Sequence, residues 1–149
     1  QSELQFHNLN PGKVVKLDDV TITTALINKT QKSIGYKISW QNYIVAYVTD
    51  LQKEIDAAEQ ESITHLVKDV DLLITNISTS LTFHKTESDN SHWQTAVNLA
   101  LTSNIKQIVF SHHHPDHSDD WLDQVQIEIA SAFPEAIIAR EGLILVVGQ

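Results

Sequence analysis

Short segments in which apolar residues alternate with polar ones dominate the first third of the chain. Alternation with a period of two is typical of strands that bury one face. The predicted strands are Lys13–Leu17, Val20–Leu26, Ile34–Ser39 and Tyr43–Val48. A turn at residues 17–19 joins the first two and a turn at residues 40–42 joins the last two, so this part of the chain is expected to fold as a β-meander.

After Asp50 the spacing of apolar residues changes, and amphipathic helices alternate with short buried strands. Helices are expected within residues 51–67, at Trp93–Leu101 and at Trp121–Phe133, the last one ending near Pro134. Strands are expected at Asp71–Ile74, Ile105–Phe110, Ala136–Ala139 and Leu143–Val147. This order predicts one layered α/β domain over residues 1–149.

Charge and composition narrow the classes of function. The ten Lys and Arg residues are scattered, so a net charge of −9 disfavours a nucleic-acid partner. No apolar run approaches the roughly 20 residues that span a membrane, and the first residues do not resemble a secretory signal, so we expect a cytoplasmic protein without membrane contact. Because there is no cysteine, any metal must be bound by His and carboxylate side chains.

Four histidines and one aspartate gather in the segment SHHHPDH at residues 111–117, directly after a predicted buried strand. Neutral imidazole is a preferred zinc ligand, and a carboxylate beside it can bind a second metal or orient the ring. The candidate ligands in this segment are His112, His114, Asp116 and His117, which have the spacing HxHxDH. The alternative interpretation is a solvated, histidine-rich loop.

Four longer segments carry a family resemblance: GYKISWQNYIVAYVTD, DVDLLI, WQTAVNLALTSNIKQIVFSHHHPDHSDDWLD and AREGLILVV. Together, from about Gln5 to Val147, they resemble the metallo-β-lactamase-fold superfamily of metal-dependent hydrolases, in the branch of ribonuclease Z and phosphodiesterases. The HxHxDH motif of that family belongs to its first half, whereas only 32 residues follow His117 here. The resemblance therefore implies the C-terminal half of an αββα sandwich.

The resemblance also implies a site and a chemistry. Asp50 corresponds to the carboxylate that bridges two metals and His112 to the last histidine ligand, which makes both catalytic; His114, Asp116 and His117 lie just beyond. The implied cofactor is a divalent metal, with zinc first and manganese or iron as alternatives. Such a metal lowers the pKa of bound water toward about 7. The implied activity is hydrolysis of a phosphodiester or a related ester.

The sequence departs from the family pattern in three places. The first half of the fold, with its HxHxDH loop, has no counterpart before Gln1. Lys29 and Thr30 stand where the family commonly has His-Pro, and a cation there would repel a metal. The family has the run Gly-His-Ser-Thr where this chain has Asp-Asn-Ser-His at residues 89–92, so Asn90 stands in place of the histidine. In a shifted register, His92 could replace the missing histidine.

These departures leave alternatives open. Two ligands are too few for a catalytic metal centre, so metal binding is expected to be weak, lost, or completed by an N-terminal half-domain or a second copy of the chain. A non-catalytic member of the superfamily, acting in protein interaction or regulation, is the second hypothesis. The third is a histidine-rich, metal-storing loop on an unrelated α/β scaffold.

Overall fold

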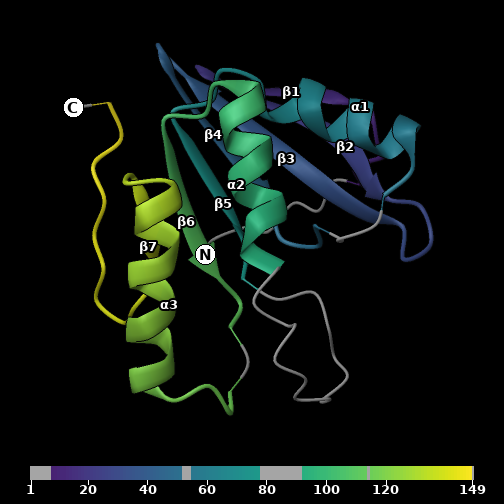
Figure 1. The fold of residues 1–149 in the computed structure, drawn as a ribbon. Helices are drawn as coiled ribbons and strands as arrows, with labels where there is room; N and C mark the ends of the chain where they lie inside the picture. Colours follow the sequence, from purple (N-terminus) through teal and green to yellow (C-terminus); the bar gives the residue numbers. More distant parts are fainter. Residues whose placement is uncertain (1–7, 52–54, 78–91, 114, 149) are drawn as a thin grey trace, which may run out of the picture.

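The computed structural model describes residues 8–51, 55–77, 92–113 and 115–148, which form one seven-stranded sheet and three helices (Figure 1). The strands are β1 (Val14–Leu17), β2 (Val20–Asn28), β3 (Ser33–Trp40), β4 (Tyr43–Val48), β5 (Leu72–Asn76), β6 (Gln107–Ser111) and β7 (Ala136–Ile138). The helices are α1 (Ala57–Val67), α2 (His92–Ser103) and α3 (Asp119–Ala132).

The strands lie side by side in the order in which they occur along the chain. β1 to β4 form an antiparallel meander, and β4 to β7 are parallel. Tight hairpin turns require positive φ, which Asp18 and Gln41 adopt (φ 51° at each). Parallel neighbours need a crossover connection, and α1, α2 and α3 each lie in one of the three crossovers.

Local signals in the sequence fix the ends of the helices. At the start of α1, the Asp56 carboxylate accepts from the backbone N of Glu59 at 2.8 Å, and the Glu59 carboxylate accepts from the backbone N of Asp56 at 3.0 Å. This reciprocal pair is a capping box. The Ser118 hydroxyl caps α3 by accepting from the backbone N of Trp121 at 3.2 Å. Asn104 follows α2 with φ 54°, the left-handed conformation that commonly ends a helix.

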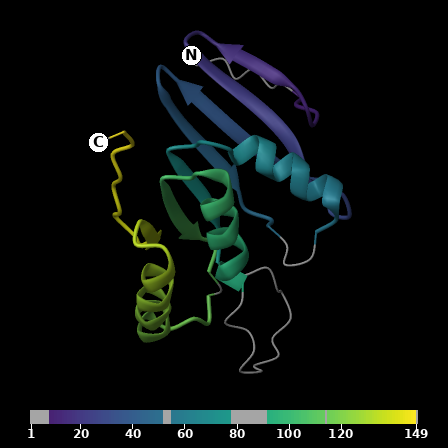
Figure 2. The ribbon, with the colours of Figure 1, turned by 45° about the horizontal axis from the view of Figure 1, so that its top comes forward.

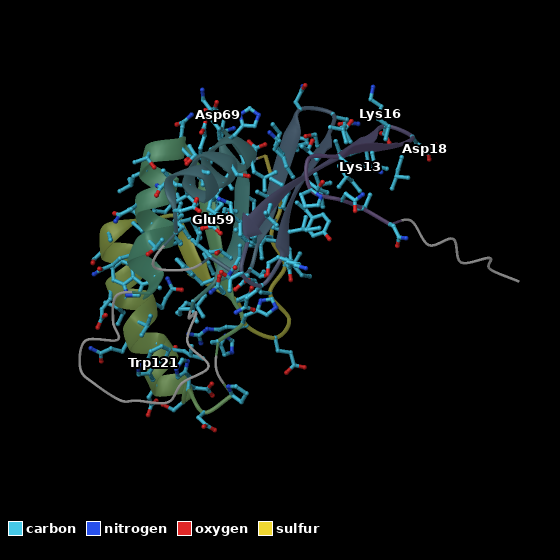
Figure 3. The ribbon with its side chains drawn as sticks, turned by 90° about the vertical axis from the view of Figure 1, so that its right-hand side faces the viewer. Lys13, Lys16, Asp18, Glu59, Asp69 and Trp121 are labelled. Carbon is cyan, nitrogen blue, oxygen red and sulfur yellow. The ribbon has the colours of Figure 1, made fainter. Side chains whose placement is uncertain are left out.

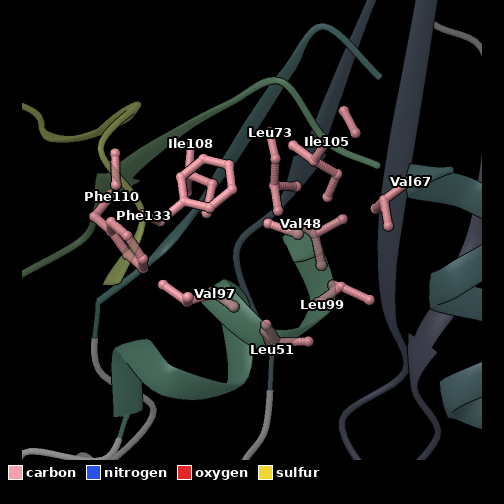
Figure 4. Packing of buried hydrophobic residues seen from close by; sticks show 14 of the residues in the cluster. Val48, Leu51, Val67, Leu73, Val97, Leu99, Ile105, Ile108, Phe110 and Phe133 are labelled. Carbon is pink, nitrogen blue, oxygen red and sulfur yellow. The ribbon is translucent and has the colours of Figure 1, made fainter. Parts of the chain in front are cut away.

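The three helices cover one face of the sheet, and the hydrophobic core lies between the helices and this face (Figure 2). Figure 4 shows Val48, Leu73, Ile108 and Phe110 directed from the sheet into this layer. At Gly35 the sheet has no room for a side chain, since a Cβ there would lie 2.8 Å from Leu66 Cδ2 of α1. The close approach of α1 to β3 therefore depends on glycine.

The opposite face of the sheet is apolar too, and no helix of the described residues covers it. Because side chains alternate along a strand and Ala46 and Val48 belong to the core, Tyr43 and Tyr47 face the other way. We call this side the open face; its partly exposed side chains include Leu17, Ile38, Trp40, Tyr43 and Tyr47. Trp40 is 44% exposed and Tyr43 is 36% exposed.

The C-terminal segment lies against part of the open face. Residues 145–147 and the side chains of Ile38, Trp40, Tyr43 and Val45 line a pocket of about 360 Å³. Gly148 lies so close to the Tyr43 ring that a Cβ there would be 1.7 Å from it. The rest of this face, toward β1, remains outside that contact.

Most of the predicted elements are confirmed, with boundaries shifted by a few residues. The strand predicted at Leu143–Val147 is wrong, because the segment forms no strand and lies over the open face instead. Leu101, the last residue of the helix predicted at Trp93–Leu101, is exposed, whereas Leu99 is buried. Within the described ranges, no helix is long and apolar enough to cross a membrane.

Candidate metal site at the carboxyl ends of the parallel strands

The candidate ligands Asp50 and His112 follow two strands that end at the same edge of the sheet. β4 and β6 both run parallel to β5 and lie on either side of it. Asp50 comes two residues after β4, and His112 comes directly after β6. Ligand sites are commonly built at the carboxyl ends of parallel strands, and the topology brings the two residues to the same edge, on either side of the end of β5.

Asp50 is half-buried, and its surroundings fix its position. The Ser33 hydroxyl at the start of β3 donates a hydrogen bond to a carboxylate oxygen of Asp50. The backbone N of the next residue, Leu51, donates to Oδ1 of the buried Asn76 at 3.1 Å. Asn76 is the last residue of β5, so this hydrogen bond ties the segment after β4 to the end of its neighbour.

His112 is exposed, and its backbone adopts the left-handed conformation, with φ 53°. Its Nδ1 lies 2.9 Å from the Ser111 hydroxyl, which also donates to the carbonyl oxygen of Thr75 at 3.1 Å. The ring of Tyr47 on β4 meets the His112 ring edge-on, with centroids 6.4 Å apart. The His112 imidazole therefore extends across the end of β5 toward the strand that leads to Asp50.

Asp116 and His117, two further candidate ligands, lie toward α3. The His117 ring stacks on Trp121 in the first turn of α3, with centroids 3.8 Å apart, and Figure 3 labels Trp121 at that end of the helix. Asp116 is exposed. His114 lies outside the described residues, as does Asn90. The roles of Asp116 and His117 as metal ligands stay predictions.

Lys29 is directed to the start of α1. Its Nζ lies 2.7 Å from Asp56 Oδ2, and its backbone N donates to Glu59 at 2.7 Å. The hydrogen bond with Asp56 raises the pKa of Lys29 and lowers the pKa of Asp56. The positive charge that was expected to repel a metal is thus paired with acidic groups of the α1 capping box.

The donors at the sheet edge match a divalent metal in kind. A carboxylate and an imidazole suit zinc, manganese and iron, but a zinc site normally takes three or four protein donors. Among the described residues, no group of three or more His, Asp or Glu side chains is arranged to hold a metal ion. Asp50 and His112 therefore fit part of a metal site, and further donors would have to complete it.

The sequence did not single out Ser33 and Ser111, which contact the two candidate ligands, or Asn76, which holds the residue after Asp50. All three lie at ends of strands: Ser33 begins β3, Asn76 ends β5 and Ser111 ends β6. One signal in the sequence could have found such residues: a polar residue at the boundary of a predicted strand, close to a candidate ligand. Trp121, in the first turn of α3, is exposed and stacks on His117.

Comparison with known proteins adds evidence on the fold. The sequence matches no protein-family model and no curated protein. Solved structures do match. The metallo-β-lactamase-fold protein YhfI from Bacillus subtilis superposes with a TM-score of 0.62 at 16% identity, over 91% of this chain and 53% of that one. Human tRNase Z, short form, has a TM-score of 0.60 at 12% identity, over 91% of this chain and 46% of that one.

A third structure, from Thermotoga maritima, is assigned to the metallo-β-lactamase superfamily as a Zn-dependent hydrolase. It has a TM-score of 0.56 at 17% identity, over 80% of this chain and 59% of that one. The chain thus spans about half the length of these proteins. The likeness also counts against an unrelated scaffold for the histidine-rich loop. The mixed sheet with its three helices is the α/β fold of these metallo-β-lactamase superfamily structures, over about half of their length.

Proposed function

We propose that this chain is one half of a metal-dependent hydrolase of the metallo-β-lactamase superfamily and contributes Asp50 and His112 to a divalent-metal site. The observation that carries the proposal is the placement of both residues at one sheet edge, after β4 and β6, with β5 between them. Zinc is the first candidate, because the T. maritima neighbour is assigned as Zn-dependent and the donors are oxygen and nitrogen.

A phosphodiester or a related ester is the proposed substrate class. When bound, a divalent metal supplies an activated water and stabilises negative charge on a phosphoryl oxygen. The contribution of this chain is to position its donors: Ser33 and Asn76 hold Asp50 and the residue after it, and Ser111 holds His112. Human tRNase Z, a neighbour in fold, is named for its action on tRNA, but a net charge of −9 disfavours nucleic acid here.

The remaining ligands are proposed to come from a second half-domain that packs on the open face. This face carries Trp40 and Tyr43 partly exposed, and exposed apolar patches rimmed by polar residues commonly mark interaction sites. The superposed structures are about twice as long as this chain, which leaves room for such a half. A second copy of the chain is the alternative occupant.

A second candidate function is a non-catalytic domain that acts in protein interaction or regulation. The open face favours this second function, because an exposed apolar face commonly marks an interaction site. Lys29 favours it too, because it stands where the family commonly has His-Pro and is paired with Asp56. Under this hypothesis, Asp50→Asn and His112→Gln leave both the fold and partner binding unchanged.

The two hypotheses are separated by hydrolysis of bis(p-nitrophenyl) phosphate in the presence of zinc or manganese, assayed on this chain together with the proposed second half-domain. The hydrolase proposal expects metal-dependent cleavage that both Asp50→Asn and His112→Gln abolish. The exposed Asp18→Asn serves as control and should retain the rate. No cleavage, together with zinc binding that neither substitution weakens, would overturn the hydrolase and favour the interaction domain.

A further inference from the structure

We infer that Ser111 is a positioning residue that holds His112 in the tautomer with its proton on Nδ1, so that Nε2 keeps a free lone pair for a metal ion. The inference rests on the proposed function in one respect only, namely that His112 is a ligand. The tautomer itself follows from contacts around Ser111 and can be measured without metal.

The Ser111 hydroxyl has one proton and two close neighbours. The carbonyl oxygen of Thr75 lies 3.1 Å away and can only accept, so the contact is favourable only if the hydroxyl proton points to it. If the proton pointed to His112 instead, two oxygen atoms would face each other at that distance without a proton between them. The hydroxyl therefore donates to Thr75.

The second neighbour, Nδ1 of His112, lies 2.9 Å from the same hydroxyl oxygen. Because the hydroxyl proton points to Thr75, this second contact is a hydrogen bond only if Nδ1 carries the imidazole proton and donates it to the hydroxyl oxygen. A neutral imidazole has a single N–H, so Nε2 is then unprotonated. Fixing the tautomer through the nitrogen that does not bind metal is how histidine ligands are generally oriented.

The backbone around Ser111 makes this arrangement rigid. Ser111 is paired with Asn76 in the parallel ladder, and its carbonyl oxygen accepts from the backbone N of Ile77 at 3.1 Å. His112 itself is exposed, and an exposed imidazole in water favours the other tautomer, with the proton on Nε2. The Ser111 contact is thus required to reverse the ordinary preference of the ring.

The test is a two-bond ¹H–¹⁵N correlation spectrum of the histidine rings in the full chain, recorded without metal at an alkaline pH where imidazole is neutral. The signals of His112 are assigned by their loss in His112→Gln. The variants are Ser111→Ala, which removes the hydroxyl, and Ser111→Thr, which restores one. Ser131→Ala, at an exposed serine near the end of α3, is the matched control, and backbone amide spectra verify that each variant is folded.

The expected result is the Nδ1–H tautomer in the wild type, in Ser111→Thr and in Ser131→Ala, and the Nε2–H tautomer in Ser111→Ala. Zinc titrated into the same samples should bind about 10- to 100-fold more weakly to Ser111→Ala than to the wild type. An Nε2–H tautomer in the wild type, or no change in Ser111→Ala, would overturn the inference. The expected tautomers, together with zinc binding that Ser111→Ala and His112→Gln both leave unchanged, would support the role of Ser111 and overturn the proposed role of His112 as a ligand instead.

Discussion

The Ser33 hydroxyl donates a hydrogen bond to the carboxylate of Asp50, although 17 positions separate the two residues in the chain. Ser33 begins β3 in the antiparallel part of the sheet, whereas Asp50 follows β4 where the parallel part starts. The antiparallel meander therefore contributes to the candidate site, because Ser33 at the start of β3 orients the carboxylate that is proposed to bind metal.

Ser33→Ala is expected to weaken zinc binding about tenfold, since a ligating carboxylate that loses its hydrogen-bond donor is less well oriented. Ser33→Thr keeps a hydroxyl and should bind zinc almost as the wild type does. Isothermal titration calorimetry measures both, with Ser131→Ala as the control. Unchanged affinity in Ser33→Ala, beside a large loss in Asp50→Asn, would show that Ser33 does not orient the ligand.

Gly35→Ala is expected to lower the free energy of unfolding by about 1–3 kcal/mol, because the added methyl group has no space. Its Cβ would lie 2.8 Å from Leu66 Cδ2 and 2.9 Å from Ile27 Cγ2. Urea unfolding provides the measurement. Adding Leu66→Ala should make room for the methyl group, so the double variant should be less unstable than the sum of the two single effects. Strict additivity would contradict this packing argument.

The buried Asp71 makes stability depend on pH. Burial alone would raise the pKa of Asp71, but hydrogen bonds from the Lys106 ammonium and from the backbone N of Ile44 outweigh burial and hold the pKa below its ordinary value. A lowered folded-state pKa stabilises the protein fully above the unfolded-state pKa of about 4. That contribution is lost as the pH falls below about 4 and through the folded-state pKa.

Asp71→Asn should therefore reduce the free energy of unfolding at neutral pH by roughly 1–3 kcal/mol, and the difference from the wild type should shrink as the pH falls below about 4. Urea unfolding across this range measures the effect. Asp18→Asn, in an exposed turn with φ 51° that Asn also tolerates, is the control. A difference that stays constant down to the lowest pH would contradict the assigned cause.

The open face should make the chain self-associate when no second half-domain is present, because association of two copies removes the apolar surface of this face from water. Sedimentation velocity should show association that increases with concentration and that Trp40→Arg and Tyr43→Arg weaken. Ile127→Arg, on α3, changes an apolar side chain that is 72% exposed on the helical side and should not affect association. A monomer at every concentration, or an equal effect of Ile127→Arg, would argue against the open face as an interface.

The elements were largely predictable because their signals are local. The turn at Asp18, the helix stop at Asn104 and the strand Tyr43–Val48 each follow from a few adjacent residues. Leu143–Val147 has the composition of a strand, but strand formation depends on tertiary contacts as well as on propensity. The segment lies over the open face instead.

The candidate ligands could be proposed from the sequence, whereas the residues that orient them could not. Asp50 and His112 follow predicted strands, and strand ends in a parallel sheet meet at one edge. The contact of Ser33 with Asp50 depends on the register of β3 with β4, in which Tyr36 pairs with Tyr47. The pattern of apolar residues predicts both strands but leaves the pairing of individual residues beyond the strand ends open.

The most direct test of the proposed metal site is whether Asp50 and His112 bind the same metal ion. Zinc affinity would be measured by calorimetry for the wild type, Asp50→Asn, His112→Gln and the double variant. If both residues contact one ion, each single substitution lowers the affinity at least tenfold, and the double variant is weaker than the wild type by less than the product of the two losses. Zinc binding that neither substitution weakens, or losses that multiply independently, would contradict a shared metal site at this edge of the sheet.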